Sequence, residues 1–185
     1  MIALPAPKIL LTGNPGAGKT TTVNRVIERL RGTIDMTGFV SDELREGGRR
    51  VGFRGRTLDG REFLLAHVRN SGDARIGPYG VDLGGLETIG LEALTPSSAR
   101  TLVVVDEIGK MECLSDAFKA RVAALLEDDM PFLATVAAVG VGFVKHVRQN
   151  PRAKLFTVAR GGSERMADEI VRTLTRALMP PGGPR

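Results

Sequence analysis

A glycine-rich segment at residues 13–20 constrains the fold of this 185-residue chain more than any other feature. Its sequence, GNPGAGKT, fits the pattern G-x-x-x-x-G-K-[ST] at every defined position. The apolar run Lys8–Thr12 before it is typical of a buried strand, and Lys19–Leu30 after it has apolar residues at helical spacing. A strand, a glycine-rich turn and a helix in this order predict a phosphate-binding loop at the carboxyl end of a strand.

Strand and helix patterns alternate along the rest of the chain, which predicts an α/β domain with a mostly parallel sheet flanked by helices. Further strands are expected at Gly38–Ser41, Thr101–Val105, Phe132–Val136 and Lys154–Val158, and further helices at Leu86–Leu94, Ser115–Glu127, Gly142–Arg148 and Ser163–Leu178. Ser115 and Ser163 are the expected N-caps of their helices. Ile76–Gly85 fits neither pattern. We expect one domain over residues 1–179 and a frayed tail at 180–185.

An arginine-rich stretch interrupts this alternation early in the chain. Arg50–Thr57 and Arg61–Val68 are typical of two paired strands, with Leu58-Asp59-Gly60 between them. Asp-Gly is a strong signal for a type I′ turn. We therefore expect a β-hairpin inserted at about residues 45–68.

The net charge of +5 is unevenly distributed. Residues 45–61 contain six arginines and two acids, and residues 145–165 contain six Lys or Arg and one acid. Such patches favour a polyphosphate or a nucleic-acid partner, but a solvated arginine-rich surface explains most of the single arginines equally well. Because only Phe53 lies among the hairpin arginines, a base-stacking platform is not favoured.

Cysteine count and hydropathy narrow the class of protein further. Cys113 is the single cysteine, so an internal disulfide is excluded and a cysteine-based zinc site lacks its ligands. The uncharged run Pro131–Val144 is too short to cross a bilayer, and Met1–Pro7 lacks the pattern of a signal peptide. We expect a cytoplasmic protein without a membrane partner, and we favour a monomer.

The glycine-rich segment has a physical role for each of its parts. Its glycines allow backbone N–H groups to surround a phosphate, and the following helix adds its positive dipole end. Lys19 is expected to bridge the β- and γ-phosphates, the Thr20 hydroxyl to bind Mg²⁺ and Thr21 to reach the α-phosphate. The nucleotide-binding loop predicted here consists of Gly13, Asn14, Pro15, Gly16, Ala17, Gly18, Lys19, Thr20 and Thr21.

A second candidate segment follows the most apolar β-branched run of the chain. An apolar strand that ends in Asp is typical of P-loop enzymes, where that Asp belongs to the Mg²⁺ shell, so Asp106 is the second expected metal residue. Glu107 is placed to orient or deprotonate the attacking water. The sequence also fits the D-x-x-G of a GTPase switch, but it contains no N-K-x-D guanine reader, so a signalling GTPase is disfavoured. The predicted nucleotide-binding residues in this segment are Val103, Val104, Val105, Asp106, Glu107, Ile108, Gly109 and Lys110.

Several other polar residues are weaker candidates. Thr135 ends an expected strand and is either a sensor of the γ-phosphate or a residue with high β-propensity. Lys110 lies in a loop after the acidic pair and is a candidate for a nucleotide or transition-state contact. Arg45, Arg54 or Arg56 could stabilise charge on the γ-phosphate, and the sequence does not choose among them. Cys113, His67 and His146 are expected to be packing or surface residues.

The order of these motifs resembles the cancer-related nucleoside-triphosphatase family over about residues 8–174. The resemblance rests on the segments Thr12–Thr21, Gly38–Arg45, Arg50–Phe53, Gly77–Asp82 and Val105–Glu112. It implies a RecA-like fold with an added hairpin, and Mg²⁺-dependent hydrolysis of nucleoside triphosphates with weak base selectivity. It also supports catalytic roles for Glu107, Lys110 and Thr135. The chain departs from the family at Gly162-Ser163-Glu164, where members usually have Asn-Arg-Asp, and at the apolar segment Ala137–Gly142.

Two alternative functions are compatible with the same motifs. In a nucleotide or small-molecule kinase, the arginine-rich hairpin would act as a lid, and Asp106 or Glu107 would accept the proton of an acceptor hydroxyl. In a nucleic-acid-stimulated ATPase module, the basic patches would bind the nucleic-acid backbone. A kinase would transfer the phosphoryl group to an acceptor faster than it releases free phosphate. An ATPase module would bind nucleic acid in a salt-sensitive way, and its turnover would be stimulated by RNA or single-stranded DNA.

Overall fold

Strand β1 (Lys8–Thr12) is buried at every residue and lies between two parallel neighbours. The computed structural model describes residues 5–179, so the expected tail at 180–185 lies outside the described residues. The other strands are β2 (Met36–Glu46), β3 (Arg49–Thr57), β4 (Glu62–His67), β5 (Arg75–Ile76), β6 (Tyr79–Val81), β7 (Leu102–Ile108), β8 (Phe132–Val136) and β9 (Lys154–Thr157). The helices are α1 (Lys19–Leu30), α2 (Leu83–Gly85), α3 (Leu91–Ala93), α4 (Asp116–Glu127), α5 (Phe143–Arg148) and α6 (Ser163–Leu178), with a π-helical turn at Leu86–Gly90 and a 3₁₀ turn at Glu112–Leu114.

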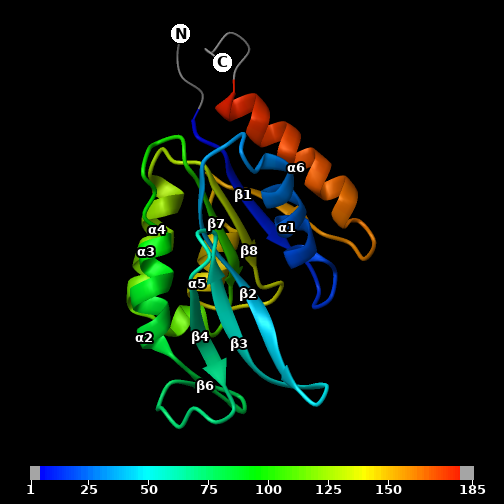
Figure 1. The fold of residues 1–185 in the computed structure, drawn as a ribbon. Helices are drawn as coiled ribbons and strands as arrows, with labels where there is room; N and C mark the ends of the chain where they lie inside the picture. Colours follow the sequence, from blue (N-terminus) through cyan, green and yellow to red (C-terminus); the bar gives the residue numbers. More distant parts are fainter. Residues whose placement is uncertain (1–4, 180–185) are drawn as a thin grey trace.

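The strands of the described residues form one nine-stranded sheet in the order β5-β6-β4-β3-β2-β7-β8-β1-β9. Strands β2, β7, β8, β1 and β9 are parallel, while β3 to β6 add to the β2 edge in antiparallel fashion. The predicted α/β fold with a parallel sheet is therefore confirmed for the core. In Figure 1 the carboxyl ends of the parallel strands point toward the antiparallel extension.

Helices cover the parallel core on both faces (Figure 1). Helices α1 and α6 bury Val23, Val26 and Ile170 with one face of the sheet, and α4 and α5 bury Phe118 and Val144 with the other. The long uninterrupted apolar strands are thus explained by burial on two sides. No helix within residues 5–179 is long and apolar enough to cross a membrane.

The inserted hairpin is present, but its turn differs from the prediction. β3 and β4 pair antiparallel as expected. A type I′ turn needs positive φ at both central residues, whereas in this loop only Gly60 has a positive φ, of 94°. Gly60 donates its N–H to the Thr57 carbonyl at 3.0 Å, so the loop is a type I turn followed by a glycine in the left-handed region.

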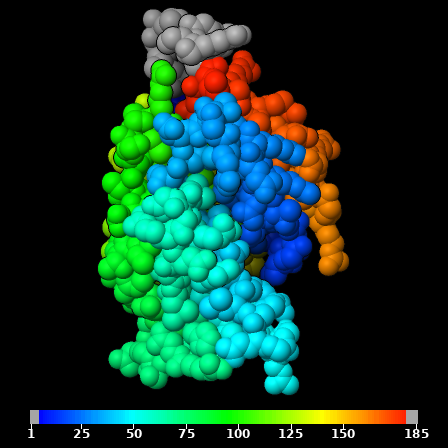
Figure 2. All heavy atoms as spheres, in the orientation of Figure 1, coloured from blue at the N-terminus to red at the C-terminus, as the bar shows by residue number. Residues whose placement is uncertain are grey.

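The insertion is also larger than expected. β2 continues past Ser41 to Glu46 and pairs with β3 along that extension. The expected strand ended at Ser41 because four of the five residues at 42–46 are charged, so the segment shows no apolar pattern. In Figure 2 the insertion, coloured light blue to turquoise, covers the lower part of the visible face. The unassigned stretch Ile76–Gly85 contributes β6 and α2 beside it.

Of the two predicted N-caps, only one is confirmed. Ser115 accepts a hydrogen bond from the Phe118 N–H at 3.0 Å at the start of α4. Ser163 is instead the first residue of α6, and Gly162 occupies the N-cap position. The Ser163 hydroxyl accepts a hydrogen bond from the Arg25 guanidinium at 2.5 Å, which joins α6 to α1.

Candidate active site

The glycine-rich loop connects β1 to α1 in a conformation that requires its glycines. Gly18 has φ of 100° directly before α1, where L side chains are strained. At Gly13 an added Cβ would lie 2.6 Å from the Val158 carbonyl oxygen, which is too close for any side chain. Helix α1 begins without a side-chain cap and without an acidic residue in its first turn. Its first N–H groups and its dipole are therefore available to an anion.

Lys19 connects this loop to the acidic end of β7. Its ammonium lies 3.3 Å from the Gly13 carbonyl oxygen and 3.6 Å from Glu107 Oε2. The Lys19 side chain is only 11% exposed, so its charge is weakly screened by water. Lys19 and Glu107, each predicted separately as a site residue, are thus brought together although 87 residues lie between them in the sequence.

Asp106 is the most deeply buried acid beside the loop, with 1% of its surface exposed. Burial raises the pKa of its carboxyl above the ordinary value, and the hydrogen bond from the Thr135 hydroxyl and the nearby Thr20 hydroxyl act in the opposite direction. Its second oxygen, Oδ2, is buried without a hydrogen-bond partner among the described residues. An unpartnered buried carboxylate oxygen marks a position for a ligand or ion.

Glu107 faces the cavity next to the phosphate loop. Burial raises the pKa of the Glu107 carboxyl above its ordinary value, the Lys19 ammonium lowers it, and the neighbouring Asp106 raises it again. The side chain is 32% exposed, so a water molecule can reach it. This position and basicity suit a group that accepts a proton from water.

The phosphate cavity has a volume of about 460 Å³ and lies between the loop, the carboxyl end of β7 and the insertion. Besides Lys19, Thr20 and Glu107, its lining includes Ser41, Glu43, Phe53, Ala137, Ala138 and Val139. The residues from β2 and β3 were not predicted as site residues. Two sequence signals could have found them: the two-residue spacing of Ser41 and Glu43, which places both on one face of a strand, and the family-like segments Gly38–Arg45 and Arg50–Phe53 that contain all three.

A smaller cavity of about 230 Å³ adjoins the phosphate cavity, because Ser41, Phe53 and Glu107 line both. Lys110, predicted to contact the nucleotide, is exposed and lines this smaller cavity instead of the phosphate cavity. Glu112, not predicted as a site residue, is 5% exposed and accepts the Gly109 N–H at 3.1 Å. Burial raises the pKa of Glu112 from 4.5 to about 8.

Several residues predicted to contact the nucleotide are buried in the core and support the site from behind. Val103, Val104, Val105 and Ile108 are fully buried in the core, so they hold β7 in place and cannot contact a nucleotide. Thr135 is also fully buried, and its hydroxyl donates to Asp106 from the adjacent strand β8. That hydrogen bond makes Thr135 a residue that orients Asp106.

The arginines of the insertion are mostly bound to acids of the insertion itself. Arg45 pairs with Glu43 at 2.6 Å, Arg54 with Glu62 at 3.1 Å and Arg56 with Asp42 at 3.4 Å. None of the three lines the phosphate cavity. These pairs agree with the solvated-surface interpretation of the basic patch.

A sequence profile of a protein family described as NTPase matches residues 8–171. The chain belongs to this NTPase family. The nucleoside-triphosphatase THEP1 of Thermotoga maritima is 35% identical over 168 residues, which are 90% of this chain and 95% of that protein. Among solved structures, THEP1 from Aquifex aeolicus is similar with a TM-score of 0.82 and 30% identity, over 91% of this chain and 99% of that one. A human cancer-related nucleoside triphosphatase gives a TM-score of 0.78 and 32% identity, over 93% and 99% of the two chains. The family resemblance predicted from the motifs is confirmed.

Proposed function

We propose that this chain hydrolyses nucleoside 5′-triphosphates, ATP and GTP among them, to nucleoside diphosphate and phosphate. One arrangement supports the proposal above all others: the Lys19 ammonium, the Glu107 carboxylate and the uncapped start of α1 surround the same cavity. These groups supply a cation for phosphate oxygens, a base for water and N–H donors for the phosphate chain. The relatives named as nucleoside-triphosphatases support the same activity.

In this proposal the loop and Lys19 bind the triphosphate. N–H groups at the start of α1 donate to phosphate oxygens, and the Lys19 ammonium moves from the Gly13 carbonyl to the β- and γ-phosphate oxygens. Phosphate binding also separates Lys19 from Glu107, which removes a charge that lowers the pKa of the Glu107 carboxyl. Substrate binding therefore makes Glu107 a stronger base.

Glu107 then accepts a proton from the attacking water. The water oxygen forms a bond to the γ-phosphorus, the bond from the γ-phosphorus to the bridging oxygen breaks, and the nucleoside diphosphate leaves with that oxygen. The catalytic effect comes mainly from positioning and from charge stabilisation by groups that are already in place. Lys110, which lines the adjoining cavity beyond Glu107, is proposed to approach the γ-phosphate oxygens from that side.

Thr20 and Asp106 are the proposed ligands of Mg²⁺. The unpartnered Asp106 Oδ2 fits this assignment, because Mg²⁺ prefers carboxylate and hydroxyl oxygens. When bound, the ion would neutralise charge on the β- and γ-phosphate oxygens. Thr135 holds Asp106 in place through its hydrogen bond to Oδ1.

We propose weak selectivity for the base, because the side chains at the family's Asn-Arg-Asp position are occupied. Ser163 binds Arg25, and Glu164 forms ion pairs with both Arg25 and Arg29. These contacts tie the start of α6 to α1. They leave few free side-chain groups there to distinguish one base edge from another.

The decisive experiment measures phosphate release with Mg²⁺ and each common triphosphate, without any acceptor. Glu107→Gln is expected to retain binding of a non-hydrolysable analogue and to lose release by about a hundredfold or more, as expected for loss of a general base. Glu28→Gln on the exposed surface of α1 is the matched control and should leave turnover unchanged. Full turnover in Glu107→Gln would refute the role of this carboxylate. Tight binding without release in the unaltered protein would favour the kinase, and an acceptor screen would follow.

We also propose a cytoplasmic monomer. Cys113 is a free, half-buried thiol, which fits a reducing compartment. Cell fractionation and sedimentation of the purified protein test location and oligomeric state.

A further inference from the structure

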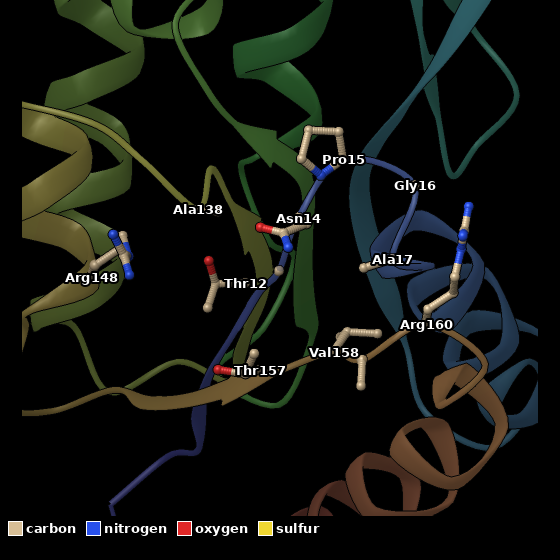
Figure 3. A pocket seen from close by; sticks show the side chains of 12 residues that line it. Thr12, Asn14, Pro15, Gly16, Ala17, Ala138, Arg148, Thr157, Val158 and Arg160 are labelled. Atoms are coloured by element: carbon tan, nitrogen blue, oxygen red, sulfur yellow. The ribbon is translucent and has the colours of Figure 1, made fainter.

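Two further cavities adjoin the phosphate cavity. The cavity in Figure 3 shares residues 13–16 of the phosphate loop with it and so belongs to the nucleotide site. The smaller cavity, of about 230 Å³, lies beside Glu107. Its lining contains a second acid, Glu112, which the proposed hydrolysis does not use.

The carboxyl group of Glu112 holds the turn that follows β7. Its Oε2 atom accepts the Gly109 N–H at 3.1 Å, and the Gly109 carbonyl oxygen accepts the Cys113 N–H at 3.2 Å. Gly109 is buried, so its N–H needs an acceptor within the protein. Both backbone groups of Gly109 are therefore fixed, two residues after Glu107.

Gly109 is in contact with both acids. A Cβ atom added to it would lie 3.0 Å from Glu112 Oε2 and 3.4 Å from Glu107 Oε1. The two carboxyl groups thus pack against the same side of one glycine, and Glu112 is also hydrogen-bonded to it. The position of Gly109 therefore limits where the Glu107 side chain can lie.

The second acid can occupy this position because it is mostly neutral at pH 7. Burial raises the pKa of Glu112 from 4.5 to about 8, and the negative charge of Glu107 adds to that rise. A neutral carboxyl group still accepts the Gly109 N–H. Because it carries no charge, it does not repel the Glu107 carboxylate from its place.

We propose that Glu112 is a positioning residue, which through Gly109 holds the Glu107 side chain at the edge of the phosphate cavity. Glu112 itself does not line the phosphate cavity, so it acts through its neighbours and not on the substrate. The catalytic consequence rests on the proposed function, whereas the placement of Glu107 is a property of the fold.

The first test measures phosphate release and binding of a non-hydrolysable triphosphate analogue. Glu112→Leu removes the acceptor of the Gly109 N–H and should lower kcat by about tenfold or more, because Glu107 is misplaced. Analogue affinity should change by less than about twofold, since no phosphate ligand is removed. Glu112→Gln keeps a neutral acceptor and should restore most of the turnover.

Glu87→Leu is the matched control. The exposed Glu87 accepts a hydrogen bond from the Ser115 hydroxyl at 2.6 Å, close to Glu112 in the chain, and it lines neither cavity beside Glu107. Its replacement should leave turnover unchanged. Gly109→Ala tests the same contact if Glu112→Leu does not fold, because the added Cβ crowds both carboxyl groups. It should lower kcat more than analogue affinity.

Carbon NMR of the glutamate carboxyl groups reports the surroundings of Glu107 without turnover. Its signal is assigned by its disappearance in Glu107→Gln, and it should shift in Glu112→Leu or Gly109→Ala and stay in place in Glu87→Leu. If the unaltered protein releases no phosphate, the proposed hydrolysis fails, and this shift still decides the placement of Glu107. An unmoved signal overturns the inference, as do full turnover in Glu112→Leu, equal losses in Glu112→Leu and Glu112→Gln, or equal losses in Glu112→Leu and Glu87→Leu.

Discussion

Replacement of Thr135 by valine isolates one buried hydrogen bond at the centre of the site. The Thr135 hydroxyl donates to Asp106 Oδ1, and both residues are at most 1% exposed. Valine has nearly the same shape and favours a strand, so the change leaves packing almost intact. It leaves the buried Asp106 carboxylate without its side-chain hydrogen bond from Thr135, while Oδ2 is already unpartnered among the described residues.

The expected loss of stability follows from the charge on the acceptor. A hydrogen bond to a charged group contributes about 1.5–3 kcal/mol, so Thr135→Val should lower the free energy of unfolding by about 2 kcal/mol. For a domain of this size that corresponds to a fall in Tm of about 4–8 °C. The loss should shrink at acidic pH, where Asp106 is protonated and the acceptor is neutral.

Thr12→Val is the matched control for this experiment. Thr12 lies at the end of β1, beside the strand that contains Thr135, and its hydroxyl is buried without a partner. Removal of that hydroxyl should leave stability unchanged or slightly increased. Urea unfolding of both variants at neutral and acidic pH measures the difference. An equal effect of the two substitutions would refute the reasoning that the bond to Asp106 is the stabilising contact.

Three further predictions address the same site. Lys19→Ala should weaken binding of a triphosphate analogue as well as abolish turnover, as measured by calorimetry and phosphate release, and unaltered affinity would contradict its role as a phosphate ligand. Chelation of divalent cations should abolish phosphate release, and Mg²⁺ should raise the Tm of the unaltered protein more than that of Asp106→Asn; an equal rise would contradict the metal assignment. The pKa of Glu112 is raised from 4.5 to about 8 in the folded protein, so the free energy of unfolding should fall as the pH rises through that window, by at most about 5 kcal/mol. In urea unfolding at several pH values, Glu112→Gln should reduce this pH dependence. A pH profile unchanged by Glu112→Gln would refute the assignment.

The phosphate loop and most elements were predictable because their signals are local. The G-x-x-x-x-G-K-[ST] pattern occupies eight consecutive residues, and β1 and α1 occur at the predicted boundaries. The acidic end of β7 was visible for the same reason, since apolar residues and the two acids follow one another in the chain. Periodicity and turn chemistry act over a few residues, so a single sequence contains them.

The prediction was incomplete where the backbone conformation depends on partners elsewhere. The Asp-Gly dipeptide predicted a type I′ turn, but the hydrogen bonds of Thr57 to Gly60 and Arg61 close a different loop. Ser163 has the chemistry of an N-cap, but its hydroxyl is used by Arg25 of another helix. In both cases a tertiary or cross-strand contact decided between two locally acceptable conformations.

The sequence by itself determined that this chain has a phosphate-binding loop, an acidic strand end and a parallel α/β core. Only the tertiary structure decided which side chains surround them. The order of strands places β8 between β1 and β7, so that Thr135 meets Asp106. Strands β2 and β3 place Ser41 and Phe53 in the phosphate cavity, and α5 places Arg148 in an adjoining cavity on the other side of the phosphate loop. These contacts join residues far apart in the chain, and strand order and packing, which no local pattern encodes, bring them together.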